Sequence, residues 1–367
     1  MTPRTIETIT RSSLKDLASS DAAYIRNVKN VSSYNWIDNT LARTIAVPGV
    51  PSLWSPPGVP ARIQPPKDSG LDDIGDNAIR IARRPMEPLF RAIFTMKPSF
   101  DVRTIDVISD RHNILKLLSF IDSSSERDKG ESCTIKLELV RNTLLMCRQE
   151  TNVTQSLAPY QLRGYGHEFE KAYTRKCMFL STSHYRIISY DFCGLNCIIR
   201  HKTFVRYVSS DPKAITRLGL GDVLPRADYL TRNPEKVGVM FGGRTIPLKS
   251  TLEIKTCSLT RPAGFGEVAP RLWVSQTPNL VQAFHLRGQF LKPEAKDVSA
   301  KTRKWERDNQ ENLRTLGALI KKINAVVKGC GGRAILRYDL STVSLIISRD
   351  EGESGMLPAD LYSKWDE

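Results

Sequence analysis

Hydrophobic residues follow a strand-like and then a helix-like pattern where the globular part of the chain begins, near residue 85. Residues 101–109 are rich in β-branched side chains, which is typical of a strand. Apolar residues then recur at intervals of three and four through 111–121, and Ser109 or Asp110 can cap that helix. A strand followed directly by a helix is therefore predicted here.

The same two patterns recur to the end of the chain and predict an α+β fold. Further strands are predicted at 133–140, 143–148, 184–192, 196–208, 237–241, 250–258, 333–338 and 343–348. Helices are predicted at 166–174 and 301–328, and the segment 271–290 breaks at Pro278 before an alternating stretch, 280–286. We expect a mixed, largely antiparallel sheet with helices packed around it.

The N-terminal part reads differently. Residues 1 to about 45 are polar and predict one short helix at most, whereas residues 46–66 are dense in Pro and Gly, which excludes helix and central strand. We interpret 46–66 as an extended arm laid over the outside with Trp54 as its apolar anchor; a disordered linker is the alternative. The predicted organisation is a segment 1–66 and a single domain 67–367.

Composition narrows the class of protein. The chain has 367 residues, 40% of them hydrophobic and 25% charged, which is ordinary for a large globular protein. It contains neither an apolar run long enough to span a membrane nor a signal peptide. Seven irregularly spaced cysteines suggest reduced thiols, and Cys193 and Cys197 lack the second pair that zinc requires. We expect an intracellular monomer, in nucleus or cytoplasm.

The net charge of +15 points to a polyanionic partner. Nucleic acid is the first candidate and an anionic membrane the second, while a generically basic surface is the alternative. The basic residues are spread along the chain, which favours a folded groove over a disordered arm.

The stretch Thr251-Leu-Glu-Ile-Lys-Thr256 carries the strongest chemical signal. Glu253 and Lys255 lie two positions apart on a predicted strand, so both side chains project from one face. This is the second half of a PD-(D/E)XK-type nuclease site, in which a carboxylate holds a divalent metal and a lysine stabilises the attacking water or developing charge. An exposed, solvated strand face is the alternative.

Five segments that follow one another along the chain, preceded by a pair of N-terminal motifs, extend this signal over most of the chain from about residue 34. The N-terminal pair is Tyr34-Asn-Trp36 and Val47-Pro-Gly-Val-Pro51; the five segments are Ser109–Leu118, Gly164–Glu170, Ile198–Val205, Glu253–Lys255 and Leu272–Gln276 followed by Phe284–Gly288. Together they resemble the DXO-like family of decapping nucleases, especially its fungal members. The resemblance implies a PD-(D/E)XK-like cleft, RNA 5′ ends as substrate and Mg²⁺ or Mn²⁺ as cofactor.

The resemblance also implies roles for individual residues. Arg111 would face the RNA 5′ end, since a guanidinium suits phosphate. Glu170 and Glu253 would lie at the metal, together with the backbone carbonyl of Ile254. Lys255 and Gln276 would act beside the scissile phosphate. Without the resemblance, Arg111, Glu170 and Gln276 read as ordinary polar helix residues.

One expected motif is degenerate. Where the family carries Glu-x-Asp, this chain has Lys202 and Phe204, so an ammonium and a phenyl ring replace two metal-binding carboxylates. Lys202 is expected to pair with Glu253 and partly mimic the metal. Asp191 is the one nearby carboxylate that could substitute, and only if the backbone brings it in.

Three classes of function remain open, and the first is the predicted one. The first is a metal-dependent RNA 5′-end decapping nuclease of the pyrophosphohydrolase or deNADding type. The second is a catalytically impaired homologue that binds RNA 5′ ends or docks on a 5′→3′ exoribonuclease. The third is a basic α/β interaction module whose motifs match by chance. Clustering of the motif residues in one groove separates the first two classes from the third.

Overall fold

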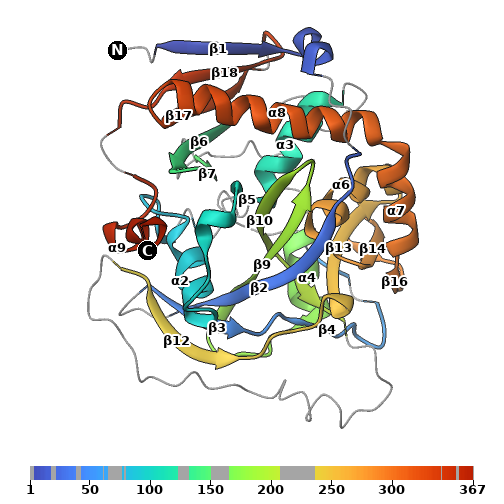
Figure 1. Ribbon diagram of the computed structural model, residues 1–367. Coiled ribbons are helices and arrows are strands. Elements are labelled where there is room, and N and C mark those ends of the chain that lie inside the picture. The colour runs from blue at the N-terminus through green and yellow to red at the C-terminus, as the bar shows by residue number, and fades with distance from the viewer. Residues whose placement is uncertain are drawn as a thin grey trace.

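Strands dominate the architecture, and the computed structural model arranges them in two mixed β-sheets with helices around them (Figure 1). The structure describes residues 4–17, 22–38, 43–60, 62–64, 77, 80–122, 132–149, 165–206, 236–339, 341–352 and 355–366. The α+β class and the mixed sheet expected from the sequence are confirmed.

The larger sheet has eleven strands and runs from the top of the molecule to its base (Figure 1). In spatial order they are β1 (Thr5–Thr10), β18 (Ser344–Arg349), β17 (Arg333–Asp339), β6 (Cys133–Val140), β7 (Thr143–Arg148), β5 (Val107–Asp110), β10 (Leu195–Lys202), β9 (Ser181–Phe192), β2 (Arg26–Ile37), β3 (Thr44–Gly49) and β12 (Gly238–Gly243). Most neighbours are antiparallel, but β5 pairs in parallel with both β7 and β10.

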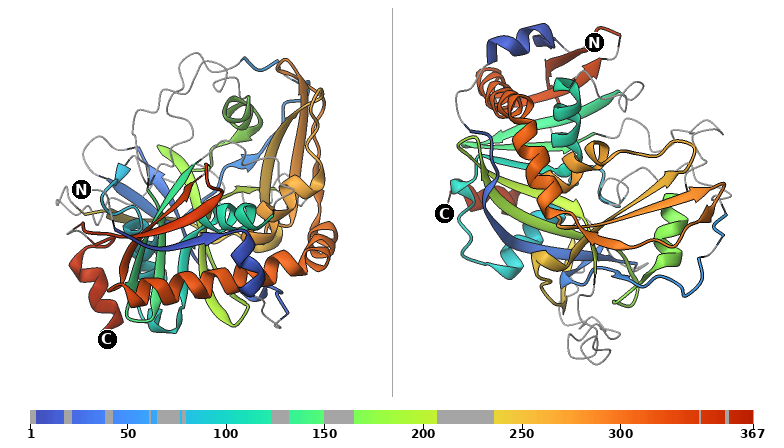
Figure 2. Two further views of the ribbon diagram at one scale, coloured as in Figure 1. Left: turned by 90° about the horizontal axis from the view of Figure 1, so that it is seen from above. Right: turned by 90° about the vertical axis from the view of Figure 1, so that its right-hand side faces the viewer.

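The smaller sheet stands beside the larger one (Figure 2). Its strands, in order, are β15 (Gln289–Phe290), β14 (Asn279–Leu286), β13 (Thr251–Ser258), β11 (Phe204–Val205), β4 (Leu53–Trp54) and β8 (Thr174–Arg175), with β16 (Ala295–Asp297) also paired to β14. The chain passes from β10 in the large sheet to β11 in the small one through the single residue Thr203. This crossing brings the end of β10 next to β13.

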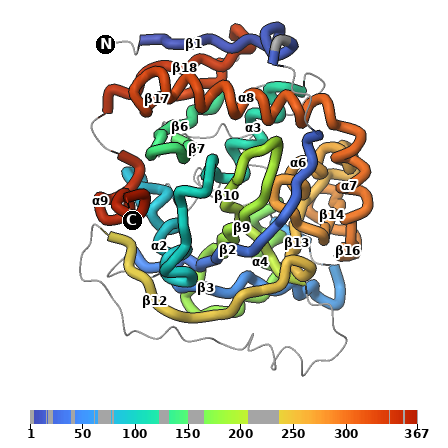
Figure 3. The backbone as a smooth tube through the Cα atoms, viewed as in Figure 1, coloured from blue at the N-terminus to red at the C-terminus, as the bar shows by residue number. Residues whose placement is uncertain are grey.

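Helices cover both faces of the large sheet. They are α2 (Glu87–Met96), α3 (Arg111–Ile121), α4 (Gly166–Tyr173), α6 (Phe265–Ser275), α7 (Ser299–Asp308), α8 (Gln310–Gly329) and α9 (Ala359–Tyr362), and short 3-10 turns lie at Ser12–Leu17, Val102–Thr104, Leu248–Ser250 and Ser363–Trp365. The long α8 crosses the upper strands, as the chain path in Figure 3 shows. None of the described helices is both long and apolar enough to cross a membrane.

The core is divided in two by the large sheet because successive strand residues face opposite sides. On β10, Ile199 joins the cluster formed with α3, α6 and α8, while Ile198 joins the cluster formed with α2 and the C-terminal turn. The neighbouring strand β5 divides in the same way, with Val107 on the first side and Ile108 on the second. Strands buried on both faces explain why these segments are hydrophobic without strict alternation.

The structure corrects the interpretation of the N-terminal part. The polar segment forms the edge strand β1 and the long strand β2, and the predicted arm begins with β3, an interior strand that contains Pro48. Trp54 does act as an anchor, stacking on Tyr173 with ring centroids 5.9 Å apart. The predicted division between residues 66 and 67 lies outside the described residues.

Three further boundaries differ from those predicted. The strand expected from residue 101 starts at Val107, after a 3-10 turn capped by Asp101. The strand expected at 196–208 is broken at Thr203, and its last two residues lie outside the described part. The single helix expected at 301–328 is two helices, because Asn309 adopts a non-helical conformation and its side-chain amide bonds to the Trp305 carbonyl at 2.8 Å.

Candidate functional site

Two arginines hold Glu253 between the two sheets. Glu253 lies in β13 of the small sheet with only 5% of its surface exposed. Arg111, the first residue of α3, donates from Nη1 to Oε2 at 2.7 Å, and Arg271 of α6 donates from Nη1 to Oε1 at 3.0 Å. Both carboxylate oxygens are therefore engaged by guanidinium groups, which make strong charge-assisted hydrogen bonds.

Electrostatics favour the ionised form of Glu253. Burial alone would raise the pKa of this carboxyl, but the charges of Arg111 and Arg271 outweigh it and hold the pKa below its usual value. Burial lowers the pKa of Arg111, and the Glu253 carboxylate opposes that shift. The three side chains form a charged cluster with one positive charge in excess.

A second ion pair lies near this charged cluster, and the two ion pairs together are called the charged site. Lys202, at the end of β10, donates from Nζ to Oε2 of Glu170 on α4 at 3.0 Å. Its ammonium also lies 5.4 Å from the centroid of the Phe204 ring. The expected pairing of Lys202 with Glu253 is therefore wrong, because Arg111 and Arg271 already occupy that carboxylate. The charge of Glu170 acts on Arg111, which joins the two ion pairs electrostatically.

The remaining predicted residues are placed as follows. Lys255 follows Glu253 by two positions in β13 and is partly buried. Ile254 and Phe204 direct their side chains into an apolar cluster with Phe169 of α4. The roles predicted for Lys255 and for the Ile254 carbonyl stay predictions.

Gln276 ends α6 in a left-handed conformation with φ of 50°. Its side-chain amide donates to the Trp273 carbonyl at 2.6 Å, so the amide nitrogen bonds to its own helix and not to the cluster. Trp273 is 2% exposed, and its indole nitrogen bonds to Glu306 at 2.8 Å. The predicted motif at 272–276 thus builds the end of a helix in this structure.

Asp191 does not replace a lost carboxylate. It lies opposite Asn196 on β10, whereas Lys202 lies opposite Tyr185. Asn196 and Lys202 are six residues apart on β10, which corresponds to about 20 Å of extended chain. Its carboxylate instead bonds to the side-chain amide of Asn27.

The side chains at this position do not fit a divalent metal ion. Hard cations such as Mg²⁺ and Mn²⁺ require several oxygen ligands, usually anionic. In the described part of the chain, no three His, Cys, Asp or Glu side chains come together in an arrangement that could hold a metal. The two carboxylates at the cluster, Glu170 and Glu253, are already paired with three cations. A metal would have to displace these cations and remain beside them.

Two features of the site were not predicted from sequence. Arg271 lies in α6 directly after Pro270, and the sequence indicated no role for it. Arg200 is 1% exposed and bonds through Nε and Nη2 to both oxygens of Asp110 at 2.6 and 2.8 Å. This pair fixes β10 to the residue directly before Arg111.

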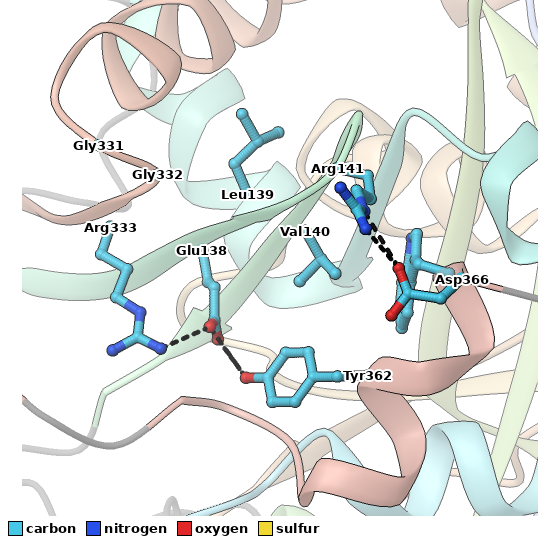
Figure 4. A pocket seen from close by; sticks show the side chains of 10 residues that line it. Glu138, Leu139, Val140, Arg141, Gly331, Gly332, Arg333, Tyr362 and Asp366 are labelled. Atoms are coloured by element: carbon cyan, nitrogen blue, oxygen red, sulfur yellow. Dashed lines mark hydrogen bonds and ion pairs between the residues drawn. The ribbon is translucent and has the colours of Figure 1, made fainter.

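A separate recess of about 350 Å³ lies among β6, the start of β17 and the C-terminal turns (Figure 4). Its buried carboxylate, Glu138, accepts hydrogen bonds from the Tyr362 hydroxyl at 2.9 Å and from the Met356 backbone N–H at 2.7 Å. Arg333 forms an ion pair with the same carboxylate at 3.4 Å. These contacts hold the C-terminal segment, and they involve none of the residues of the charged site.

Comparison with solved structures defines the class of fold. Rai1 from Candida albicans, solved in complex with pU5 and Mn²⁺, aligns with a TM-score of 0.63 and 12% identity over 98% of each chain. Rai1 from Scheffersomyces stipitis, solved with (3′-NADP)⁺ and calcium, gives 0.61 and 12% over 100% of both. Dxo1 from K. lactis, solved with manganese, gives 0.52 and 10% over 94% of this chain and 98% of that one. The chain therefore has the fold of the Rai1 and Dxo1 proteins.

In sequence, the family model described as a domain of unknown function (DUF8563) matches residues 4–361, so the chain belongs to that family. No curated protein matches it significantly.

Proposed function

We propose that this protein binds the 5′-terminal phosphate of RNA at the charged site and does so without metal-dependent hydrolysis. One observation carries the proposal: each acidic side chain at the position of the expected metal site is paired with a basic one. Glu253 is held by Arg111 and Arg271, and Glu170 by Lys202. The site has the positive charge that binds phosphate, and both of its carboxylates are already paired with basic side chains.

The geometry indicates how an anion is accepted. A carboxylate presents two oxygens to a guanidinium much as a phosphate does, so Glu253 occupies the place of a phosphate edge. The side chain of Arg271 is 46% exposed, whereas that of Arg111 is 12% exposed. Arg271 turns to an incoming phosphate while Arg111 stays with Glu253, and Lys202 adds a third positive charge.

RNA is the proposed ligand for two reasons. A solved protein of the same fold, Rai1 from Candida albicans, was crystallised with pU5. The chain also carries a net charge of +15, which favours association with a polyanion.

Hydrolysis of RNA 5′ ends by a divalent metal is the second candidate. The shared fold and the placement of Glu253 and Lys255 on one strand favour it. This reaction requires Glu253 to break its ion pairs with both arginines. It also requires a divalent cation to bind beside the ammonium of Lys202. At 4 Å and an effective dielectric constant of 20, each unit charge of such a cation is repelled by about 4 kcal/mol.

The two candidates are separated by one set of reactions. Purified protein is incubated with 5′-triphosphate RNA and with NAD-capped RNA in Mg²⁺ or Mn²⁺, beside Glu253→Gln, and RNA binding is followed by fluorescence anisotropy. We expect binding without release of pyrophosphate or cap, and we expect the variant to bind at least as tightly because it removes a competing anion. Release that disappears in Glu253→Gln establishes a nuclease and overturns the proposal.

The predicted 5′→3′ exoribonuclease partner stays a prediction. Co-purification of the two proteins, with and without RNase treatment, tests it, because a contact between the proteins survives RNase and an RNA bridge does not.

A further inference from the structure

A second polar cluster lies on the large sheet in the interior of the molecule. Arg186 and His201 are directly opposite each other on β9 and β10, and His184 lies two residues before Arg186. Residues two apart on a strand share a face, and so do directly opposite residues on neighbouring strands. The three side chains therefore form one patch, and each is at most 5% exposed.

Arg186 is buried without a counter-ion among the described residues. Its Nη1 donates to the Ile246 carbonyl at 2.7 Å, and its Nε has no hydrogen-bond partner. Burial lowers the pKa of its guanidinium to about 10, and no neighbouring carboxylate opposes this shift within the described part of the chain. A buried, unpaired positive charge is costly, and proteins normally pair such a charge or neutralise it with a bound ion.

The neighbouring histidine is also unsatisfied. Both ring nitrogens of His201 are buried and lack a hydrogen-bond partner in the described structure. His184 differs, since its Nδ1 lies 2.8 Å from the Asn35 side-chain oxygen. One guanidinium nitrogen and two imidazole nitrogens of this patch thus lack a hydrogen-bond partner among the described residues.

This patch adjoins the charged site. The charges of Arg111 and Arg186 both act on the His201 ring, and with burial they hold the pKa of that histidine well below its usual value. His201 shares a sheet face with Ile199, which packs with residues of α3 and α6, the helices that carry Arg111 and Arg271. The patch therefore lies on the same side of the large sheet as the arginine pair at Glu253.

We propose that Arg186 and His201 form an oxyanion subsite on the large sheet, which takes a tetrahedral anion of the phosphate class. Ordered water would supply hydrogen bonds to the three nitrogens, but it carries no negative charge for the guanidinium. A phosphate group supplies both the negative charge and the hydrogen-bond acceptors, because its oxygens accept from Arg186 Nε and from the imidazole N–H of His201. The inference takes the phosphate class from the proposed function.

The anion has two sources, and they are distinguished by experiment. It is either inorganic phosphate, which fills the subsite independently, or a phosphate group of the bound RNA end. The first source stabilises the free protein, whereas the second raises the affinity for phosphorylated RNA.

The test compares unfolding in potassium phosphate with unfolding in potassium chloride of equal ionic strength, for the wild type, Arg186→Met and the control Lys304→Gln on the exposed face of α7. Phosphate at ten times its dissociation constant raises the folded-to-unfolded ratio about tenfold. We expect this gain in the wild type and in Lys304→Gln, and its loss in Arg186→Met. In chloride, Arg186→Met is expected to be as stable as the wild type or more so, because it removes an unpaired buried charge.

The same variants are tested with RNA. If RNA supplies the anion, Arg186→Met weakens binding of a 5′-phosphorylated oligonucleotide about tenfold or more and leaves the 5′-hydroxyl form unchanged. His201→Leu, which keeps the guanidinium, must lose the same phosphate effect and serves if Arg186→Met does not fold.

Two results would overturn the proposed subsite. One is an equal phosphate effect in the wild type, Arg186→Met and His201→Leu; the other is no effect with either inorganic phosphate or 5′-phosphorylated RNA. Ordered water would then be assigned to these nitrogens. Stabilisation by phosphate that depends on Arg186, without any preference for 5′-phosphorylated RNA, would keep the subsite and reject the proposed function.

Discussion

At the scale of single residues, what distinguishes this site is the partner of each carboxylate. Glu253 has the position and the strand neighbour, Lys255, expected of a metal-dependent nuclease. Its oxygens nevertheless bond to Arg111 and Arg271, and the next carboxylate, Glu170, bonds to Lys202. A carboxylate held by cations in a buried site is poorly available as a metal ligand, so identity of a residue alone does not define its chemistry.

Arg271→Gln is predicted to remove most of the preference for a 5′ phosphate. The change deletes one charge-assisted hydrogen bond, worth about 1.5–3 kcal/mol, or about 10- to 150-fold in affinity. Because the side chain is 46% exposed, stability is expected to change little. Fluorescence anisotropy with 5′-phosphate and 5′-hydroxyl oligonucleotides measures the ratio, and Lys304→Gln on the exposed face of α7 controls for loss of charge. Equal losses in the two variants would contradict the assignment.

Lys202→Glu is predicted to create affinity for Mn²⁺. The variant gathers a third carboxylate near Glu170 and removes the ammonium, so a divalent cation gains ligands and loses a repulsive neighbour. Thermal unfolding with and without Mn²⁺ is expected to show stabilisation in the variant only. Lys171→Glu is the matched control, since Lys171 pairs with Glu168 on the exposed side of the same helix. Stabilisation of the wild type by Mn²⁺ would indicate that its own residues already hold a metal.

At the scale of elements, the site depends on where β10 ends. This strand carries Arg200 within the large sheet and Lys202 at its tip, and the chain then crosses to the small sheet at Thr203. Arg200 holds Asp110, the residue before α3, so the start of that helix and the tip of β10 are fixed together.

Asp110→Asn is predicted to destabilise the protein by about 3–5 kcal/mol, because it leaves the buried Arg200 without its counter-ion. Urea denaturation measures the change in the free energy of unfolding. Asp101→Asn, in the exposed pair with Arg103, is the control and is expected to change the free energy of unfolding far less. A comparable loss in both variants would show that burial of the Arg200 pair is not the cause.

Elements with one clear hydrophobic period were predictable. The helix Arg111–Ile121 and the strands Cys133–Val140 and Thr143–Arg148 have the predicted limits. The strand Arg26–Ile37 was missed because its first part is polar and Ser32, Ser33 and Asn35 interrupt the apolar residues of its buried part. Ser32 is buried there because its hydroxyl donates to the Ala92 carbonyl at 2.6 Å, a long-range contact that no local pattern encodes.

The interior strand β3 was missed for a related reason. Its Val47-Pro-Gly49 sequence argues against a central strand, yet Asn35 of β2 bonds through its side chain to both the N–H and the carbonyl of Val50. Gly49 has a φ of 68°, and a Cβ there would lie 2.1 Å from the Asn35 oxygen. The motif that carries the family resemblance thus shapes a tight turn against a neighbouring strand.

The sequence indicated which residues come together but not how they pair. Arg111 and Glu253, predicted to lie in one groove, form an ion pair, and the charge of Glu170 acts on Arg111, while the roles predicted for these residues stay predictions. The partners were not predicted, because the pairing of Arg271 with Glu253 and of Lys202 with Glu170 depends on how α6, α4 and the two sheets pack. The local sequence predicts where a residue lies along a strand, whereas its ion-pair partner depends on how the sheets assemble.

At the scale of the whole molecule, the buried histidines predict sensitivity to acid. Burial and then the charge of Arg186 lower the pKa of His184 to about 3, and burial with several basic neighbours lowers that of His112 to about 3, from an unfolded value of 6.5. The unfolded chain therefore binds more protons between these values. Their stabilising contribution is complete above pH 6.5 and is lost as the pH falls toward 3.

The free energy of unfolding is expected to fall by up to about 1.4 kcal/mol per pH unit for each such histidine below pH 6.5. Urea denaturation at pH 7.5, 6.0 and 5.0 measures the slope. His184→Asn should flatten it, whereas substitution of the exposed His167 by Gln should leave it unchanged. An unchanged slope in His184→Asn would show that this ring titrates normally.

The central claim is that the charged site recognises a 5′ phosphate with its own cations. The most direct test is the ratio of affinities for 5′-phosphorylated and 5′-hydroxyl oligouridylate, measured by anisotropy in EDTA and again in Mn²⁺. We predict a preference of at least about tenfold for the phosphorylated RNA in EDTA, unchanged by Mn²⁺. A preference that is absent in EDTA and appears only with Mn²⁺ would contradict it, because a metal and not the arginines would then bind the phosphate.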